Sequence, residues 1–198
     1  MGLELEYIDG QTPLDEEEKE GLLITSISTR NELDEFEQQN IEKAIEWTLS
    51  RKFKLEKITT EHFAKELHQK MFGDVWKWAG EFRLSNKNLG NEWQQIGILL
   101  KQLNDDCLFW TAHKTYPPEE IAVRYKHRIV QIHCFPNGNG RHSRLMADVL
   151  VNHVFGKPVF TWGGVELIKN GTQRSNYLKT IKEADNGNIK PLVAFARK

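Results

Sequence analysis

The sequence HCFPNGNGRHSR at residues 133–144 constrains the fold of this chain more than any other stretch. Apolar residues with helical spacing lead up to His133 and resume after the glycines, so the stretch predicts a tight turn between two helices. Backbone N–H groups at the start of the second helix lack helical partners, and together with the helix dipole they favour an anion. Gly138 and Gly140 permit backbone conformations that let a ligand approach the chain closely.

The same stretch carries the charged groups that a phosphate ligand requires. Arg141 and Arg144 lie three residues apart on the first turn of the second helix, so both guanidinium groups can reach one phosphate. His133 lies across the turn, and an imidazole pKa of about 6.5 suits proton abstraction near neutral pH. A base beside a bound phosphate predicts phosphoryl or nucleotidyl transfer.

Charge and composition exclude several other classes of protein. The 198 residues carry 27 Lys and Arg against 28 Asp and Glu, a net charge of −1, so we expect no direct nucleic-acid binding. Residues 121–147 contain no acid but five Lys and Arg, so a small polyanion remains a suitable ligand. The Walker pattern GxxxxGK[ST] is absent.

Cellular location is indicated by what the sequence lacks. No apolar run approaches the roughly 20 residues of a membrane-spanning helix, and the acidic start lacks the layout of a signal peptide. Cys107 and Cys134 form no CxxC pair. We therefore expect a cytoplasmic protein with two reduced, mostly buried thiols and no membrane partner.

Hydrophobic periodicity predicts a mainly α protein of roughly seven or eight helices. In the segment 73–91, Gly, Asn and aromatic residues interrupt this pattern, and we expect a short strand at 82–85 with a turn at 88–91. Residues 1–33 are predicted to form an N-terminal arm, whose acidic residues 1–20 are expected to be solvated, and residues 34–198 the folded domain. Helical spacing is found at 34–49, 60–71, 96–110, 121–132, 145–154 and 172–185.

The motif resembles the signature of the Fic (Fido) family, His-Pro-Phe-x-Asp/Glu-Gly-Asn-Gly-Arg-x-x-Arg. WAGEFR at 78–83 is similar to the segment before that family's flap, a hairpin that docks the target protein, and 176–192 is similar to its helical tail. The N-terminal IDGQTPLDEEEKEGLL resembles the subgroup called mobile mystery protein B. The resemblance implies a Fic-type helical bundle with a short β-hairpin flap. The matching motif positions are His133, Phe135, Gly138, Asn139, Gly140, Arg141 and Arg144.

This resemblance implies a protein adenylyltransferase that moves AMP from ATP to a Ser, Thr or Tyr hydroxyl of a target protein. His133 would be the general base that activates the hydroxyl. The motif loop and its arginines would hold the phosphates, and a tyrosine of the tail would contact adenine. These nucleotide-binding residues would be Gly138, Asn139, Gly140, Arg141, Arg144 and Tyr177.

Two positions depart from the family pattern. Cys134 replaces a proline, and Asn137 replaces the acid that binds Mg²⁺ in the family. We expect ATP to be used with Mg²⁺ or Mn²⁺ and Asn137 to be the metal ligand, with lower affinity because an amide oxygen is neutral. The alternatives are an interaction module that binds nucleotide with little or no activity, and a Doc-like phosphotransferase that binds ATP in the opposite sense.

The resemblance also implies regulation and partners. Ser28 and Glu32 fit the inhibitory pattern Ser/Thr-x-x-x-Glu-Gly/Asn, whose glutamate pairs with the second motif arginine, although Leu33 replaces the small residue. Ser28 is equally interpretable as a helix N-cap and Glu32 as an exposed helical residue. Lys87 and Asn88 would lie on the flap and touch the target backbone. The subgroup implies a helix-turn-helix companion protein and a toxin–antitoxin-like role.

Other histidines and aromatic residues have structural interpretations. His142 and His153 return to nearly the same helix face, but they lack a third ligand and HExxH spacing, so we expect packing or surface roles. Trp76, Trp78 and Trp110 are expected to lie in the core or along a groove.

Overall fold

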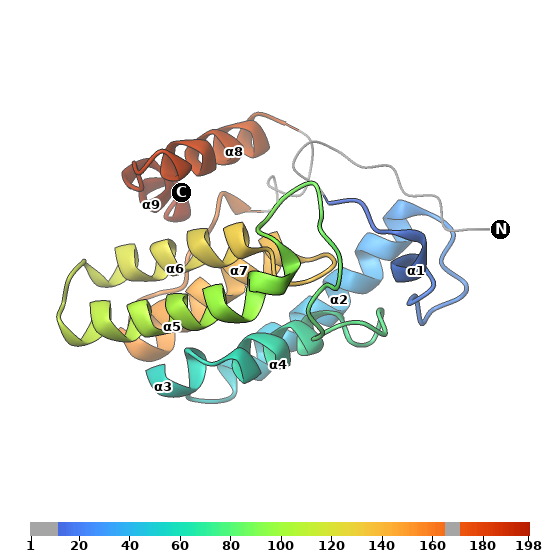
Figure 1. Ribbon diagram of the computed structural model, residues 1–198, viewed down its shortest axis with the longest axis horizontal. Helices are drawn as coiled ribbons and strands as arrows, with labels where there is room; N and C mark the ends of the chain where they lie inside the picture. The colour runs from blue at the N-terminus through green and yellow to red at the C-terminus, as the bar shows by residue number, and fades with distance from the viewer. Residues whose placement is uncertain (1–11, 165–170) are drawn as a thin grey trace.

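Helices make up most of the computed structural model, which describes residues 12–164 and 171–198 (Figure 1). The mainly α fold predicted from the sequence is confirmed. In chain order the elements are α1 (Glu16–Lys19), α2 (Arg30–Leu49), α3 (Leu55–Ile58), α4 (Glu61–Phe72), the 3₁₀ turn η1 (Trp93–Gln95), α5 (Ile96–Ala112), α6 (Pro118–Ile132), α7 (Asn139–Val149), the π turn η2 (Leu150–Val154), α8 (Thr172–Asp185) and α9 (Lys190–Ala196).

The two helices that flank the predicted turn, α6 and α7, pack against each other at the centre of the fold. Pro118 suits the first turn of α6, and the apolar side of this helix buries Ile121, Tyr125 and Ile129. Both α5 and α9 pack on α6, while α4 packs against α2 and α7 (Figure 1). The turn between α6 and α7 consequently faces α2, α8 and the N-terminal arm.

Capping residues decide where two of the helices begin. The Thr60 hydroxyl accepts a hydrogen bond from the backbone N–H of Phe63 at 3.0 Å, which confirms the predicted start of α4. In α2, Thr29 and Glu32 form a capping box, so this helix begins at Arg30, earlier than its apolar pattern indicates. The boundary predicted between residues 33 and 34 therefore falls inside a helix.

The β-hairpin expected at 82–91 does not form; residues 81–92, here called the flap loop, are irregular. Arg83 explains the difference, because its guanidinium donates to the carbonyls of Ser85 and Asn91. Its backbone N–H donates to the Cys134 carbonyl at 3.0 Å. Backbone groups that a hairpin would pair across two strands are thus held by one buried arginine and by the motif loop.

The N-terminal arm packs on the domain instead of extending into solvent. Its first residues, 1–11, lie outside the described part of the chain. Leu14 and Ile27 are each 6% exposed and belong to the common hydrophobic core, and Leu22 forms an isolated antiparallel bridge with Trp76. The prediction of a solvated arm is therefore wrong at Thr12 and Leu14, because both of these side chains are buried against the domain.

The tryptophans lie where the sequence indicates. Trp76 is buried in the core and stacks against Trp78, and half-buried Trp110 lines a small cavity. None of the described helices has the length and apolar character needed to span a membrane.

Candidate active site

A cavity of about 1250 Å³ lies where the turn between α6 and α7 faces α2, α8 and the flap loop. Small-molecule sites typically have volumes of about 300–1,000 Å³, so a nucleotide fits in this space. The cavity brings together the predicted base, metal ligand and nucleotide-binding residues: His133, Asn137, Gly138, Asn139, Gly140, Arg141, Arg144 and Tyr177.

The two glycines of the turn serve different purposes. Gly138 is the N-cap of α7 and has a φ of 77°, and a Cβ there would collide with the Phe72 ring. Only glycine suits this position. A Cβ on Gly140 would meet nothing within 4 Å. Gly140 therefore leaves open space at the start of α7, where the first N–H groups of a helix lack helical partners and favour an anion.

Asn139 closes the motif loop through both of its polar atoms. Its Oδ1 accepts from the Phe135 N–H at 2.9 Å, and its Nδ2 donates to the Phe135 carbonyl at 2.7 Å. Both polar atoms of this buried amide take part in closing the loop, and the second N–H of Nδ2 is the donor that the predicted phosphate contact would use. Asn139 thereby also fixes the shape of the turn.

His133 ends α6 in the left-handed backbone conformation, with φ 57° and ψ 62°. Residues other than glycine rarely adopt it, and the surrounding structure must hold it in place. Arg83 does so, because its Nε donates to the His133 carbonyl at 2.6 Å. A Cβ on Gly90 would collide with the His133 Cβ, so the flap loop passes directly over the histidine.

The imidazole of His133 is neutral and presents a lone pair to the cavity. Burial, assisted by the Arg83 charge, lowers the pKa of His133 to about 4, below the ordinary value expected from the sequence. A backbone hydrogen bond with Val130 opposes this lowering of the pKa. A bond that raises an imidazole pKa is one in which a ring N–H donates, so we assign the ring proton to the nitrogen facing the Val130 backbone and the acceptor role to Nε2.

A hydroxyl of the chain itself lies in front of this acceptor. Thr12 Oγ1 is 3.0 Å from His133 Nε2, and the Thr12 carbonyl accepts from Asn137 Nδ2 at 2.9 Å. Asn137 Oδ1 accepts from the Gly138 N–H at 2.7 Å, which fixes the orientation of the amide. The amide thus makes a donor bond to the arm that a carboxylate cannot make, while Oδ1 keeps a second lone pair for a cation.

The two motif arginines differ in their partners. Arg141 Nη1 donates to Glu37 Oε2 at 2.5 Å, and Glu37 Oε1 accepts from the Trp76 indole at 2.6 Å. The Glu37 side chain is 4% exposed. Arg144 has no ion pair within residues 12–164 and 171–198, and it lines the cavity beside Tyr177, so its charge is available to a phosphate.

The predicted inhibitory pair has a local role instead. Glu32 Oε2 accepts from the Ser28 and Thr29 N–H groups at 2.9 and 3.0 Å and from the Ser28 hydroxyl at 3.1 Å. These bonds hold the pKa of Glu32 below its ordinary value. Glu32 caps α2 and, among the described residues, makes no ion pair with Arg144; the glutamate that reaches a motif arginine is Glu37.

Lys126 is a cavity residue that the sequence argument missed. It is fully buried, and its Nζ lies 4.7 Å from the Tyr177 ring centroid without a hydrogen-bond partner in the described structure. Burial lowers the pKa of Lys126. Burial alone would raise the pKa of Tyr177, but the charges of Lys126 and Arg144 outweigh it and lower that pKa. The spacing in the sequence could have identified Lys126, because it lies two helical turns before His133, the C-cap of α6, and therefore on the same side.

The flap residues face the chain's own arm. Lys87 Nζ lies 2.6 Å from Asp15 and 2.7 Å from Glu18, and its side chain is 3% exposed. Asn88 is exposed on the same loop, and residues 89–91 line the cavity. Of the two residues predicted to dock a target protein, Lys87 is thus covered by the arm, whereas Asn88 is exposed.

His142 and His153 have packing roles, in line with the packing or surface roles expected from the sequence. His142 is buried and bonds the Ala64 carbonyl at 3.0 Å, and His153 Nδ1 accepts from the Phe53 N–H at 3.3 Å. His68 accepts from the Gly80 N–H and bonds the Asn137 carbonyl at 3.1 Å, which supports the motif loop from below. The described residues contain no cluster of three or more His, Cys, Asp or Glu that could hold a metal.

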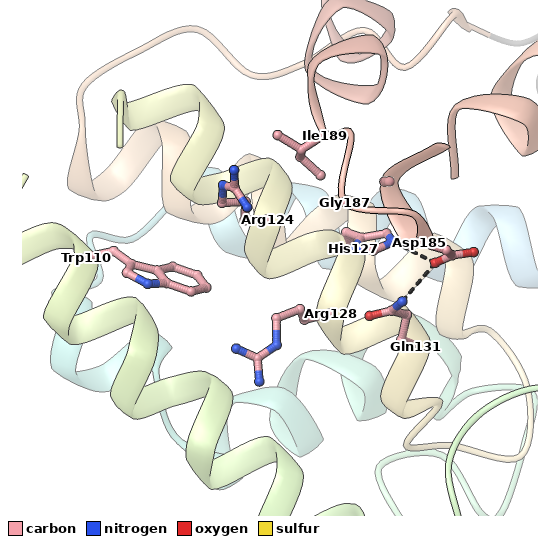
Figure 2. Close-up of a pocket in the computed structure, with 9 residues that line it drawn as sticks. Trp110, Arg124, His127, Arg128, Gln131, Asp185, Gly187 and Ile189 are labelled. Atoms are coloured by element: carbon pink, nitrogen blue, oxygen red, sulfur yellow. Dashed lines mark hydrogen bonds and ion pairs between the residues drawn. The ribbon is translucent and has the colours of Figure 1, made fainter. Parts of the chain in front are cut away.

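A smaller cavity of about 320 Å³ lies between α5, α6 and the end of α8 (Figure 2). Asp185 accepts from Gln131 at 2.8 Å and contacts His127 at 2.8 Å, as the dashed lines in Figure 2 show. Arg124 pairs with Glu120, and Arg128 pairs with Asp106. Each arginine of this cavity already has a carboxylate partner, so the larger cavity is the better anion site.

Comparison with known proteins identifies the family of this site. Residues 57–151 match the model of the Fic/DOC family. The "Protein adenylyltransferase Fic" of Drosophila willistoni is 30% identical over 135 residues, which cover 66% of this chain and 25% of that protein. The chain thus spans about a quarter of the length of the curated relatives it matches.

Solved structures show the same fold. Fic-1 from C. elegans has a TM-score of 0.67 at 20% identity, covering 90% of this chain and 51% of that one. BepC from Bartonella tribocorum, solved with bound AMPPNP, has a TM-score of 0.65 at 18% identity, covering 86% of this chain and 87% of that one. The family match thus covers residues 57–151, and the solved structures show that the fold of most of the chain is the fold of Fic domains.

Proposed function

We propose that this chain is a protein adenylyltransferase that transfers AMP from ATP to a protein hydroxyl. One observation carries the proposal: His133 Nε2 lies 3.0 Å from an alcohol oxygen, that of Thr12, beside the N-terminus of α7. A neutral imidazole in that position acts as a general base, which typically accelerates a reaction about 10²–10⁴-fold. The relatives named protein adenylyltransferase and the AMPPNP-bound BepC structure support the same chemistry.

Different residues of the cavity bind different parts of the ATP molecule. The N–H groups at the start of α7, with Gly140 leaving room before them, bind phosphate oxygens, and Arg144 neutralises the far end of the triphosphate. Tyr177 and Lys126 lie beside Arg144 and extend the site along α8 and α6. The hydroxyl oxygen attacks the α-phosphorus, pyrophosphate leaves with the electron pair, and His133 takes the proton.

We propose Mg²⁺ or Mn²⁺ as the cofactor, with Asn137 Oδ1 as the ligand from the protein. An amide oxygen fits a hard cation but supplies no charge, so the triphosphate provides most of the ligation. When bound, the cation neutralises charge on the phosphates.

A second candidate function is an interaction module that binds nucleotide with little turnover. The neutral Asn137 and the pairing of Arg141 with Glu37 favour it, since both reduce the charge complementarity of the site to metal–ATP.

We also propose a cytoplasmic protein of the mobile mystery protein B subgroup with a toxin–antitoxin-like role and a helix-turn-helix companion. The sequence of the arm at residues 8–23 supports the subgroup. Cys107 and Cys134 are free and buried, which suits a reducing compartment.

The test uses purified protein with Mg²⁺ or Mn²⁺ and ATP labelled at either the α- or the γ-phosphate, followed by mass spectrometry of the modified protein. AMP on a protein hydroxyl, lost in His133→Ala, supports the adenylyltransferase. Phosphate on the target indicates a Doc-like reaction, and nucleotide binding without transfer indicates the binding module.

A further inference from the structure

We propose that the hydroxyl of Thr12 is itself an acceptor of AMP, so that the protein modifies its own N-terminal arm. The proposal rests on the proposed function. Thr12 is 6% exposed, and its Oγ1 lies 3.0 Å from His133 Nε2, within the distance a general base requires. Because Nε2 is the acceptor, the threonine hydroxyl donates and its oxygen is polarised for attack.

The backbone of the arm is held as well as its side chain. The Thr12 carbonyl accepts from Asn137 Nδ2 at 2.9 Å. His133 and Asn137 therefore both contact this threonine, one at its hydroxyl and the other at its carbonyl. Pro13 follows it, and a residue before proline is disfavoured in the helical conformation. The segment therefore enters the site as a non-helical chain with its hydroxyl facing the base.

The flap loop anchors the arm immediately after Thr12. Lys87 pairs with Asp15 and Glu18, the Ser85 hydroxyl donates to Asp15 at 3.2 Å, and the Trp78 indole donates to the Glu18 carbonyl at 2.9 Å. These contacts make the reaction intramolecular and raise the effective concentration of the hydroxyl.

The arm and a nucleotide can occupy the site together. With Thr12 in place and forming part of its wall, the cavity still measures about 1250 Å³. Arg144, Tyr177 and the N-terminus of α7 line this same space. A segment that only obstructed the site would fill the room for the triphosphate, whereas the described residues of the arm, from Thr12 onwards, leave it.

The reaction balances without any further reagent. The Thr12 oxygen forms a bond to the α-phosphorus of ATP, and the bond from that phosphorus to the bridging oxygen of the β-phosphate breaks. Pyrophosphate takes the electron pair, and His133 Nε2 takes the hydroxyl proton. The products are Thr12–O–AMP and pyrophosphate.

The experiment incubates the full chain with ATP and Mg²⁺ or Mn²⁺ and locates AMP by peptide mass spectrometry. We expect AMP on Thr12, with a first-order rate that does not change when the protein is diluted. Thr12→Ser should remain modified at residue 12, and Thr12→Val should lose AMP there. Thr25→Val is the matched control, because Thr25 is an exposed threonine of the same arm and its loss should change nothing.

The outcomes separate this proposal from the proposed function. If AMP appears on other residues or on added lysate proteins but not on Thr12, the self-modification is wrong and the adenylyltransferase stands. If AMP appears on no protein under either metal, the proposed function is wrong and the self-modification with it.

Discussion

Glu37 lies 2.5 Å from Arg141, and its other oxygen accepts from the Trp76 indole. A buried carboxylate therefore neutralises the first motif arginine before any phosphate arrives. The residue comes from the middle of α2, and its partner comes from the first turn of α7. The pairing joins two elements that both line the cavity and sets how much positive charge the site offers.

Replacing Glu37 by Gln should strengthen ATP binding. The amide keeps the shape and a bond to Trp76 but removes the negative charge, so Arg141 can turn to the phosphates. We expect the Kd for ATP to fall roughly fivefold, about 1 kcal/mol, in calorimetric titrations. Glu46→Gln, on an exposed part of α2, is the control. An unchanged Kd in Glu37→Gln would show that Arg141 does not contact the nucleotide.

Asn137→Asp should separate metal binding from arm binding. A carboxylate adds charge for Mg²⁺, but it cannot donate to the Thr12 carbonyl and repels it. We expect half-saturation of activity at a lower Mg²⁺ concentration, together with slower modification of the arm. Metal titrations at fixed ATP measure the first effect and peptide mass spectrometry the second. If the metal requirement does not change, the proposed role of Asn137 as a ligand is wrong.

The local part of the site was predictable from the sequence, and the long-range part was not. The turn from His133 to Arg144 could be predicted because the features that form it act between residues a few positions apart. These features are the hydrophobic periodicity of the two helices, the glycines of the turn and the residues that start a helix. Thr12 and His133 are 121 positions apart, and Glu37 and Arg141 are 104 apart. No periodicity links such pairs, because tertiary packing alone brings them together.

One wrong prediction, the hairpin, and one choice between two open interpretations, that of Glu32, have specific physical causes. Residues 82–85 have strand-like composition, but Arg83 uses its guanidinium to bind the carbonyls that a hairpin would pair. Glu32 matches an inhibitory pattern, but a carboxylate three residues after Thr29 is also the partner of a capping box, and this local bond is the one that forms. In both cases a side chain forms hydrogen bonds with nearby backbone groups, and these bonds replace the contacts that the sequence pattern predicts.

His142 makes the fold sensitive to acid. It is 1% exposed, and burial lowers its pKa to about 4. Below an unfolded pKa of about 6.5 and above 4, only the unfolded chain binds this proton. The free energy of unfolding therefore falls as the pH falls, by about 1.4 kcal/mol per pH unit.

We expect urea unfolding to show this term directly. Between about pH 7 and about pH 5, His142→Gln should lose about 2 kcal/mol less stability than the wild type. His62→Gln, whose side chain is 76% exposed in the wild type, should behave like the wild type. Equal losses for His142→Gln and the wild type would mean that His142 takes up no proton on unfolding in this range.

Lys126→Met tests whether the buried ammonium serves the ligand or the fold. Methionine keeps most of the volume of the side chain and removes an unpaired buried charge, so the free energy of unfolding should stay the same or rise by about 1–2 kcal/mol. ATP should bind more weakly, by about 1–2 kcal/mol, because a charged hydrogen-bond donor to the phosphates is lost. Calorimetry and urea unfolding measure the two effects, and Lys179→Met, on an exposed part of α8, is the matched control. A variant that is destabilised but binds ATP with unchanged Kd would assign Lys126 to the packing around Tyr177 and Trp162 and remove it from the nucleotide site.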